Sequence, residues 1–259
     1  TWNVQHGRSH EDGRVDLDRF AAAVGELDAD VLALQEVDRV QPRSSGADLT
    51  ALAADALGAP HHRFAPAIEG EPGGAGPCRR TAPPDIGWVC GTEERPAADV
   101  PGYGVALLSR RPVLGWRVLR LPSVRVRRPV LCCGPPRVEL AHEEPRVALA
   151  ARIRTPEGAV TVVTTHLSCV PGRNLVQLRH VVAALGGDGP FVLLGDLNAG
   201  ARAVRAATGL ATLVTGSTFP SWSPILQLDH ALGRGVTRLD AQVRRLPVSD
   251  HCALAVTVR

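Results

Sequence analysis

Apolar positions in the first part of the chain follow two periods, which predict helices alternating with strands. Residues 17–27 carry apolar side chains three or four positions apart, which predicts a helix with Asp16 as its N-cap. The uninterrupted apolar run Val31–Leu34 predicts a strand buried on both faces. Helical spacing returns over 49–57. Residues 69–102 are rich in Gly and Pro, so we expect a long loop there, inserted on the substrate side.

Strand patterns dominate the rest of the chain. They cover 103–110, 113–121, 146–154, 159–167, 191–199, 227–234 and 253–258. We expect a turn between the first two of these strands, an irregular segment over 122–145, and one helix over 175–185 that ends at a Gly pair. Units that mix helices with consecutive strands favour two packed sheets flanked by helices.

No linker or internal repeat divides the chain, so we expect one catalytic domain over residues 1–259. The chain begins at Thr1 and contains no Met, which indicates a truncated N-terminus. It has no apolar run long enough to predict a transmembrane segment. The compartment stays open, as does the pairing of Cys78 with Cys90, and we expect a monomer.

Side chains that bind metals or phosphates stand beside the apolar strand patterns. They are Asn3, Glu36, His166, Asp196, Asn198, Asp229, Asp250 and His251. Any one of them has an ordinary interpretation as a solvated loop residue, a turn residue or a hydrogen-bonded core histidine. The whole series is different, because buried carboxylates need a cation or hydrogen-bond donors. Several carboxylates at one rim predict an all-oxygen site for a hard cation such as Mg²⁺.

Ser249, Asp250 and His251 are consecutive, which suggests a serine hydrolase triad. Neighbouring residues at a strand cannot form one, because successive side chains point to opposite faces. We therefore expect Ser249 to be a turn or capping residue, and the partners of His251 to come from elsewhere in the chain.

Seven motifs in order carry a family resemblance. They are "TWNVQHG", "LQEVD", "YGVALLSR", "TTHLS", "LLGDLNA", "QLDHAL" and "VSDHCAL". Together they resemble the endonuclease/exonuclease/phosphatase superfamily of DNase I-like, metal-dependent phosphoesterases. The resemblance implies an α+β fold: a four-layered αββα sandwich of two mostly antiparallel sheets, packed face to face with helices outside and the site at the rim. One departure is Val105, where the family often has Asn.

The resemblance also implies a metal site. Glu36 would be the principal ligand of Mg²⁺, for which Mn²⁺ is a substitute. Asn3 would lie beside it and hold metal or phosphate, and Asp250 would assist at the metal or orient its neighbours.

The remaining motif residues would act on the phosphoester. Asp229 would fix the tautomer of His251 and support its positive charge. Asp196 would orient or deprotonate the attacking water, while Asn198 and His166 would donate to the phosphoryl oxygens. The expected reaction is in-line attack by water, without a covalent intermediate.

Composition leaves the phosphoester substrate open among a small molecule, a lipid headgroup and a nucleic acid. All 29 basic residues are Arg, and the net charge of +3 permits a phosphate-bearing substrate without requiring DNA or RNA. Arg125, Arg127 and Arg128 are candidates for contacts with substrate phosphates. Four Trp, four Phe and one Tyr offer few stacking platforms for single strands.

Three functions therefore compete. The first is a small-molecule or lipid phosphodiesterase or phosphatase, the second is an endonuclease or exonuclease, and the third is a phosphate-binding relative without catalysis. Val37-Asp38 follows the Gln-Glu motif where abasic-site enzymes usually continue with Thr-Lys, which argues against DNA repair.

Overall fold

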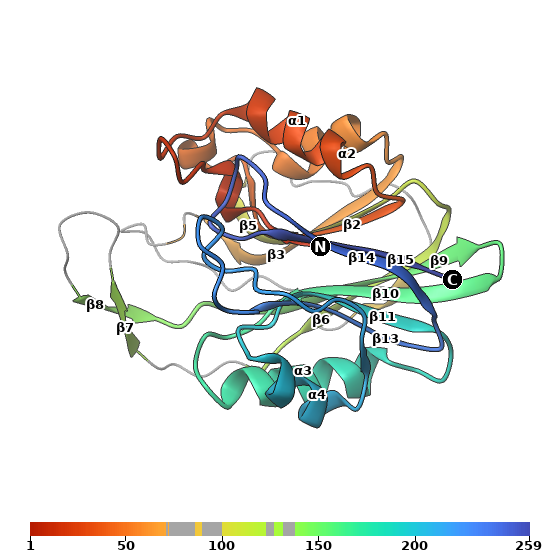
Figure 1. Ribbon diagram of the computed structural model, residues 1–259. Helices are drawn as coiled ribbons and strands as arrows, with labels where there is room; N and C mark the ends of the chain where they lie inside the picture. Colours follow the sequence, from red (N-terminus) through yellow and green to blue (C-terminus); the bar gives the residue numbers. More distant parts are fainter. Residues whose placement is uncertain (71, 73–85, 90–99, 123–126, 132–137) are drawn as a thin grey trace.

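The computed structural model describes residues 1–70, 72, 86–89, 100–122, 127–131 and 138–259 (Figure 1). One sheet has four strands in the order β1 (Trp2–Asn3), β2 (Val31–Arg39), β5 (Gly102–Ser109) and β3 (His61–Glu69). A second sheet has seven, in the order β12 (Ala211–Thr212), β13 (Asp229–Arg234), β11 (Phe191–Asp196), β10 (Gly158–His166), β9 (Val147–Thr155), β6 (Val113–Arg120) and β4 (Ile86–Val89).

Two strand pairs form smaller ladders. They are β14 (Arg238–Arg244) with β15 (Ala253–Val258), and β7 (Arg127–Leu131) with β8 (Val138–His142). The four α-helices of the described residues are α1 (Leu17–Leu27), α2 (Leu49–Leu57), α3 (Arg173–Leu185) and α4 (Ala201–Thr208). Short 3₁₀ turns, η1 (Gln5–Gly7) and η2 (Pro42–Ser44), complete the set.

The elements stack in four layers, with α1 and α2 on one side and α3 and α4 on the other (Figure 1). Among the described ladders of the two large sheets, only β1–β2 and β10–β11 are parallel. The expected α+β sandwich of two mostly antiparallel sheets is therefore confirmed.

Alternating side chains along each strand separate three apolar cores. In β2, Leu32 and Leu34 pack under α1 and α2, whereas Ala33 faces the second sheet. In β11, Val192 joins the core between the sheets and Leu193 packs under α3 and α4. Each sheet is thus buried on both faces, which explains the near-continuous apolar runs of its central strands.

The helices expected over 17–27 and 49–57 are present with those bounds, and Asp16 caps the first by accepting from the Arg19 N–H. The helix expected over 175–185 begins two residues earlier, at Arg173. None of the described helices is long and apolar enough to cross a membrane.

Other expectations were wrong. The segment over 122–145 contains the β7–β8 ladder, and the expected loop over 69–102 contains β4. The turn expected between β5 and β6 is present, but the two strands belong to different sheets, so the turn carries the chain across the sandwich. The strands β3, β12 and β14 and the helix α4 were also not anticipated. Cys78 and Cys90 lie outside the described residues.

Candidate active site at the rim of the two sheets

Strand registers place four of the expected site residues at one edge. Asn3 ends β1, and His166 ends β10 directly beside Asp196, which ends the parallel strand β11. Asp229 was expected to end or interrupt a strand, but it begins β13. Because β13 is antiparallel to β11, its first residue pairs with the last residue of β11, and Asp229 lies opposite Asp196.

Glu36 reaches the rim through a β-bulge. Gln35 and Val37 pair with consecutive residues of β5, so Glu36 is the extra residue of the ladder, with a left-handed φ of 57°. A bulge redirects a side chain that regular pleating would aim elsewhere. On the other side of β5, Gly104 permits a close approach to β3, because a Cβ there would lie 2.1 Å from the Ala65 carbonyl oxygen.

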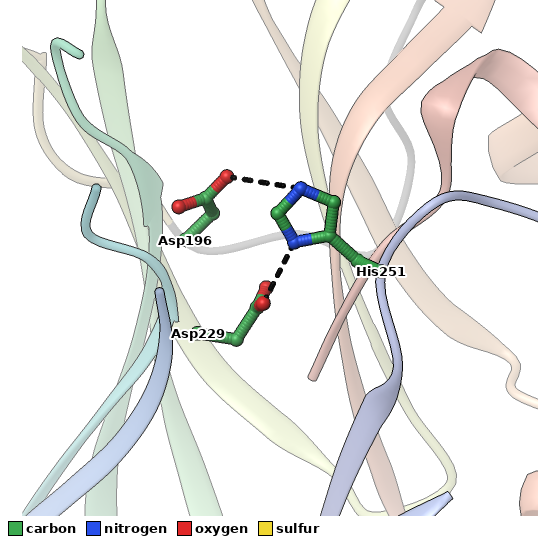
Figure 2. Close-up of side chains that lie close together, drawn as sticks. All are labelled: Asp196, Asp229 and His251. Atoms are coloured by element: carbon green, nitrogen blue, oxygen red, sulfur yellow. Dashed lines mark hydrogen bonds and ion pairs between the residues drawn. The ribbon is translucent and has the colours of Figure 1, made fainter. Parts of the chain in front are cut away.

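His251 and Asp229 form a buried hydrogen-bonded pair (Figure 2). The ring Nδ1 lies 2.7 Å from the Oδ2 of Asp229, a side chain with no exposed surface. The ring Nε2 lies 3.9 Å from the Oδ2 of Asp196 and 4.0 Å from the Oδ1 of Asp250. Burial disfavours the charged imidazole, but the carboxylates, Asp229 foremost, outweigh it and raise the pKa of His251 to about 10.

The Asn3 amide connects Glu36 with Asp196. Its Nδ2 donates to the Oε1 of Glu36 and to the Oδ2 of Asp196, both at 3.1 Å. Its Oδ1 accepts from the backbone N–H of Gln5. Gln5, which was not expected in the site, donates from Nε2 to the Oδ2 of Asp250. Two neighbouring amides therefore orient three carboxylates.

His166 and Asn198 complete the rim. The Nε2 of His166 is 3.5 Å from the Oδ2 of Asp196, and its Nδ1 is 4.0 Å from the Oε1 of Glu36. The backbone N–H of Asn198 donates to the Oδ1 of Asp196, which fixes that carboxylate, and its side chain donates to the Leu167 carbonyl. All eight residues expected in the site belong to this connected group.

Ser249 is a buried turn residue of this group. Its Oγ donates to the Asn3 carbonyl at 2.6 Å and accepts from the His251 backbone N–H at 3.1 Å. Sequence reasoning missed two further neighbours of His251. The Phe219 ring lies 5.0 Å from the imidazole ring, and the Trp2 indole donates to the His251 carbonyl. The Trp of "TWNVQHG" was a visible signal, whereas Phe219 lies outside every motif.

The charges of the site favour a bound cation. Burial raises the pKa of Glu36 to about 7 and that of Asp196 to about 6, and it also raises that of Asp250. The Oδ1 of Asp229 is buried and has no hydrogen-bond partner among the described residues. An excess of buried carboxylates over cationic groups fits a divalent metal.

Two places in the group could hold a cation. Ligating atoms of Asp196, Asp229 and His251 lie within 4.8 Å of one another. The 2.7 Å hydrogen bond between Asp229 and His251, however, already occupies the Oδ2 of Asp229 and the Nδ1 of His251, two of the possible ligand atoms. Glu36 and Asp250, with side chains 24% and 25% exposed, offer accessible carboxylate oxygens. Hard cations prefer such donors, so Glu36 and Asp250 are the better candidates for holding a divalent cation.

Of the Arg residues expected to contact substrate, Arg125 lies outside the described residues. Arg127 and Arg128 lie on β7, whose backbone pairing with β8 is described but whose side chains are not. Their role stays a prediction. Val105, the departure from the family pattern, packs in the core between the sheets.

The layered fold and its acidic, imidazole-containing rim define the class inferred from the motifs. A model of the Endonuclease/Exonuclease/phosphatase family matches residues 1–251, so the chain belongs to that family. No curated protein matches the chain by sequence.

Solved structures support the same fold. An endonuclease/exonuclease/phosphatase from Beutenbergia cavernae is 23% identical with a TM-score of 0.69, covering 100% of this chain and 70% of that one. A mannosyl-6-phosphatase from Bacteroides thetaiotaomicron is 13% identical with a TM-score of 0.58, over 93% and 91% of the two chains. A beta toxin mutant from Staphylococcus aureus, with bound magnesium ions, is 12% identical with a TM-score of 0.55, over 98% and 97%.

Proposed function

We propose that this protein is a divalent-metal-dependent phosphoester hydrolase that uses water as its nucleophile. The observation that carries the proposal is that two different kinds of group lie together at one rim of the sheets. One consists of the accessible carboxylates of Glu36 and Asp250, and the other is the buried His251–Asp229 pair. Asp196 lies between them. Phosphoester hydrolysis needs a cation, a donor for the phosphoryl oxygens and a base, and these groups would hold the cation and supply the donor and the base.

Glu36 and Asp250 would hold Mg²⁺, or Mn²⁺ in its place. The Asn3 amide would keep Glu36 in position, because its nitrogen already donates to that carboxylate. When bound, the ion would supply Lewis acidity and neutralise charge on the phosphoryl group. That the magnesium-containing beta toxin shares the fold supports a divalent ion here.

Asp196 would accept the proton of the attacking water. Its pKa of about 6 is near the range in which a carboxylate is both ionised and basic at neutral pH. Hydrogen bonds from Asn3 and from the Asn198 backbone hold both of its oxygens in place. The base is therefore oriented before substrate binds, which is the arrangement expected of a preorganised site.

His251 would donate from Nε2 to a phosphoryl oxygen, since its Nδ1 faces Asp229. The carboxylate of Asp229 supports the positive charge on the ring and fixes its orientation. His166 and Asn198 would add further donors beside Asp196. In this proposal, each of these side chains stabilises charge that develops on the phosphoryl group.

Metal add-back tests the proposal. Purified protein treated with EDTA should not hydrolyse bis(p-nitrophenyl) phosphate, and Mg²⁺ or Mn²⁺ should restore turnover. His251→Ala should not recover turnover when metal is added back. The matched control is His180→Ala, at an exposed histidine of α3, which should recover as the wild type does. Full turnover in EDTA would refute the metal assignment. Parallel assays on plasmid DNA and RNA test the nuclease alternative, and metal binding without any turnover would favour the non-catalytic one.

A further inference from the structure

A rigid apolar tip stands beside the candidate active site. Three of the exposed large apolar side chains among the described residues lie within five positions: Trp222, Ile225 and Leu226, which are 52%, 73% and 49% exposed. They belong to the loop Phe219–Leu226, which we call the apolar tip. The phosphoester chemistry proposed above does not use them.

The apolar tip is fixed to the catalytic segment by hydrogen bonds. Across its base, Phe219 and Leu226 exchange backbone hydrogen bonds of 2.9 and 3.0 Å. The Ser221 N–H donates to the Asp250 carbonyl, and its hydroxyl donates to the Ser249 carbonyl. These bonds hold the tip against the residues that precede His251, and the Phe219 ring contacts the imidazole itself. The exposed side chains are thus presented at a fixed place next to the site.

The shape and chemistry of the tip select a type of partner. An aliphatic side chain as exposed as Ile225 lies on a convex surface, so it cannot form the wall of an enclosed pocket for a small molecule. Ile and Leu also lack the planar face on which a nucleic-acid base stacks. A protruding Trp with neighbouring aliphatic residues suits the boundary between headgroups and acyl chains of a lipid layer.

A cationic side chain lies beside the tip. The Trp222 ring stacks on His10 with 5.3 Å between ring centres, and the Nη2 of Arg245 is 3.4 Å from the His10 ring Nε2. Arg245 is exposed. An apolar tip with an adjacent Arg matches a lipid surface that carries anionic headgroups.

We propose that the apolar tip inserts into the surface of a phospholipid assembly and thereby presents a headgroup phosphoester to the candidate active site. The inference rests on the proposed phosphoester hydrolysis for its catalytic part, and on the tip alone for its binding part. The two parts can therefore fail separately.

Vesicle flotation tests the binding part without any turnover. Wild-type protein should float with vesicles made of equal amounts of phosphatidylcholine and phosphatidylglycerol. Replacing Ile225 and Leu226 together with Ser should weaken that binding by about tenfold or more, because both apolar side chains lose their transfer into the lipid. The matched control replaces Val176 and Leu239, which are 54% and 58% exposed on α3 and β14, with Ser. The control should bind as the wild type does.

Fluorescence gives an independent readout. In a Trp88→Phe background, Trp222 is the one Trp left besides the buried Trp2 and Trp116, so a blue shift of emission on adding vesicles should disappear when Trp222→Phe is added. Absence of vesicle binding by the wild type, or equal loss in the tip variant and the control, would overturn the lipid proposal.

Activity separates the remaining outcomes. The tip variant should lose more turnover on vesicle phospholipid than on soluble bis(p-nitrophenyl) phosphate. Equal loss on both substrates would overturn the proposal and assign the tip to contact with small substrates. If the protein binds vesicles but hydrolyses neither substrate, the binding part of the proposal stands and the proposed phosphoester hydrolysis is refuted.

Discussion

The two halves of the site differ in how far the protein itself satisfies their charges. His251 and Asp229 are buried and neutralise each other through a 2.7 Å hydrogen bond. Glu36 and Asp250 are about a quarter exposed, and each accepts a hydrogen bond from a side-chain amide, Glu36 from Asn3 and Asp250 from Gln5. The first half carries its own counter-charge, although the Oδ1 of Asp229 has no hydrogen-bond partner among the described residues, whereas the second needs a cation. The comparison supports our proposal that one half binds the phosphoryl group and the other binds the metal.

The largest expected effect is in the half that contains His251 and Asp229. His251→Ala should lower kcat/KM by about a thousandfold, within the range of positioned proton donors. Asp229→Asn should cost nearly as much, and the double variant little more, because the pair acts as one unit. Asp240→Asn, at an exposed carboxylate, is the control. Additive losses in this double-mutant cycle would show that the pair does not work as a unit.

The pH profile separates charge from shape in the same pair. Asp229→Asn keeps the shape but removes the negative charge, so the pKa of His251 should fall from about 10. Because the protonated ring is the active form in this account, activity is lost as pH rises through that pKa. The alkaline limb of the kcat/KM profile should therefore move to lower pH. An unchanged limb would exclude His251 as its origin.

In the half that contains Glu36 and Asp250, protons should compete with the metal. Burial raises the pKa of Glu36 to about 7, so below that pH the carboxyl must release a proton when the ion binds. The apparent Mg²⁺ affinity should fall by about tenfold per pH unit below about 7 and level off above it. Isothermal titration of the metal-free protein across this range measures the slope. A flat profile would contradict the assignment of Glu36.

The motif series predicted much of the site, because strand ends can be located from apolar patterns. Asp196 and Asp229 were placed at strand ends from sequence, although Asp229 begins its strand and lies at the rim only because that strand is antiparallel. The bulge that aims Glu36 was not visible, since its left-handed φ has no marker in "LQEVD". Gln5 was missed because it has no strand pattern of its own.

The fold was less predictable where local pattern and long-range pairing diverge. The strands β5 and β6 are joined by a short connection, which resembles a hairpin in sequence, yet each finds its hydrogen-bond partners in a different sheet. The mixed polarity of β14, with mostly exposed residues, gave no buried face to detect. Local periodicity reports burial, and it does not report which strands pair.

The smallest effect should come from Ser249, whose hydroxyl contacts only the backbone of the two site residues Asn3 and His251 among the contacts described above. Ser249→Ala removes a donor to the Asn3 carbonyl and an acceptor for the His251 N–H. We expect a loss of about 1–3 kcal/mol in the free energy of unfolding and of no more than about tenfold in kcat/KM. Urea unfolding and steady-state kinetics measure both. Abolished activity in a folded variant would restore a serine-nucleophile mechanism.

The most direct test of the division between the halves is a metal titration of activity in two variants. In Glu36→Gln the half-saturating Mg²⁺ concentration should rise by about tenfold or more, and excess metal should partly restore turnover, because a carboxylate ligand has been lost. In Asp229→Asn the half-saturating Mg²⁺ concentration should match that of the wild type, although turnover is low. The control Glu157→Gln, at an exposed carboxylate, should match the wild type in both quantities. A shift in Asp229→Asn with none in Glu36→Gln would place the metal at Asp196, Asp229 and His251 and contradict the account.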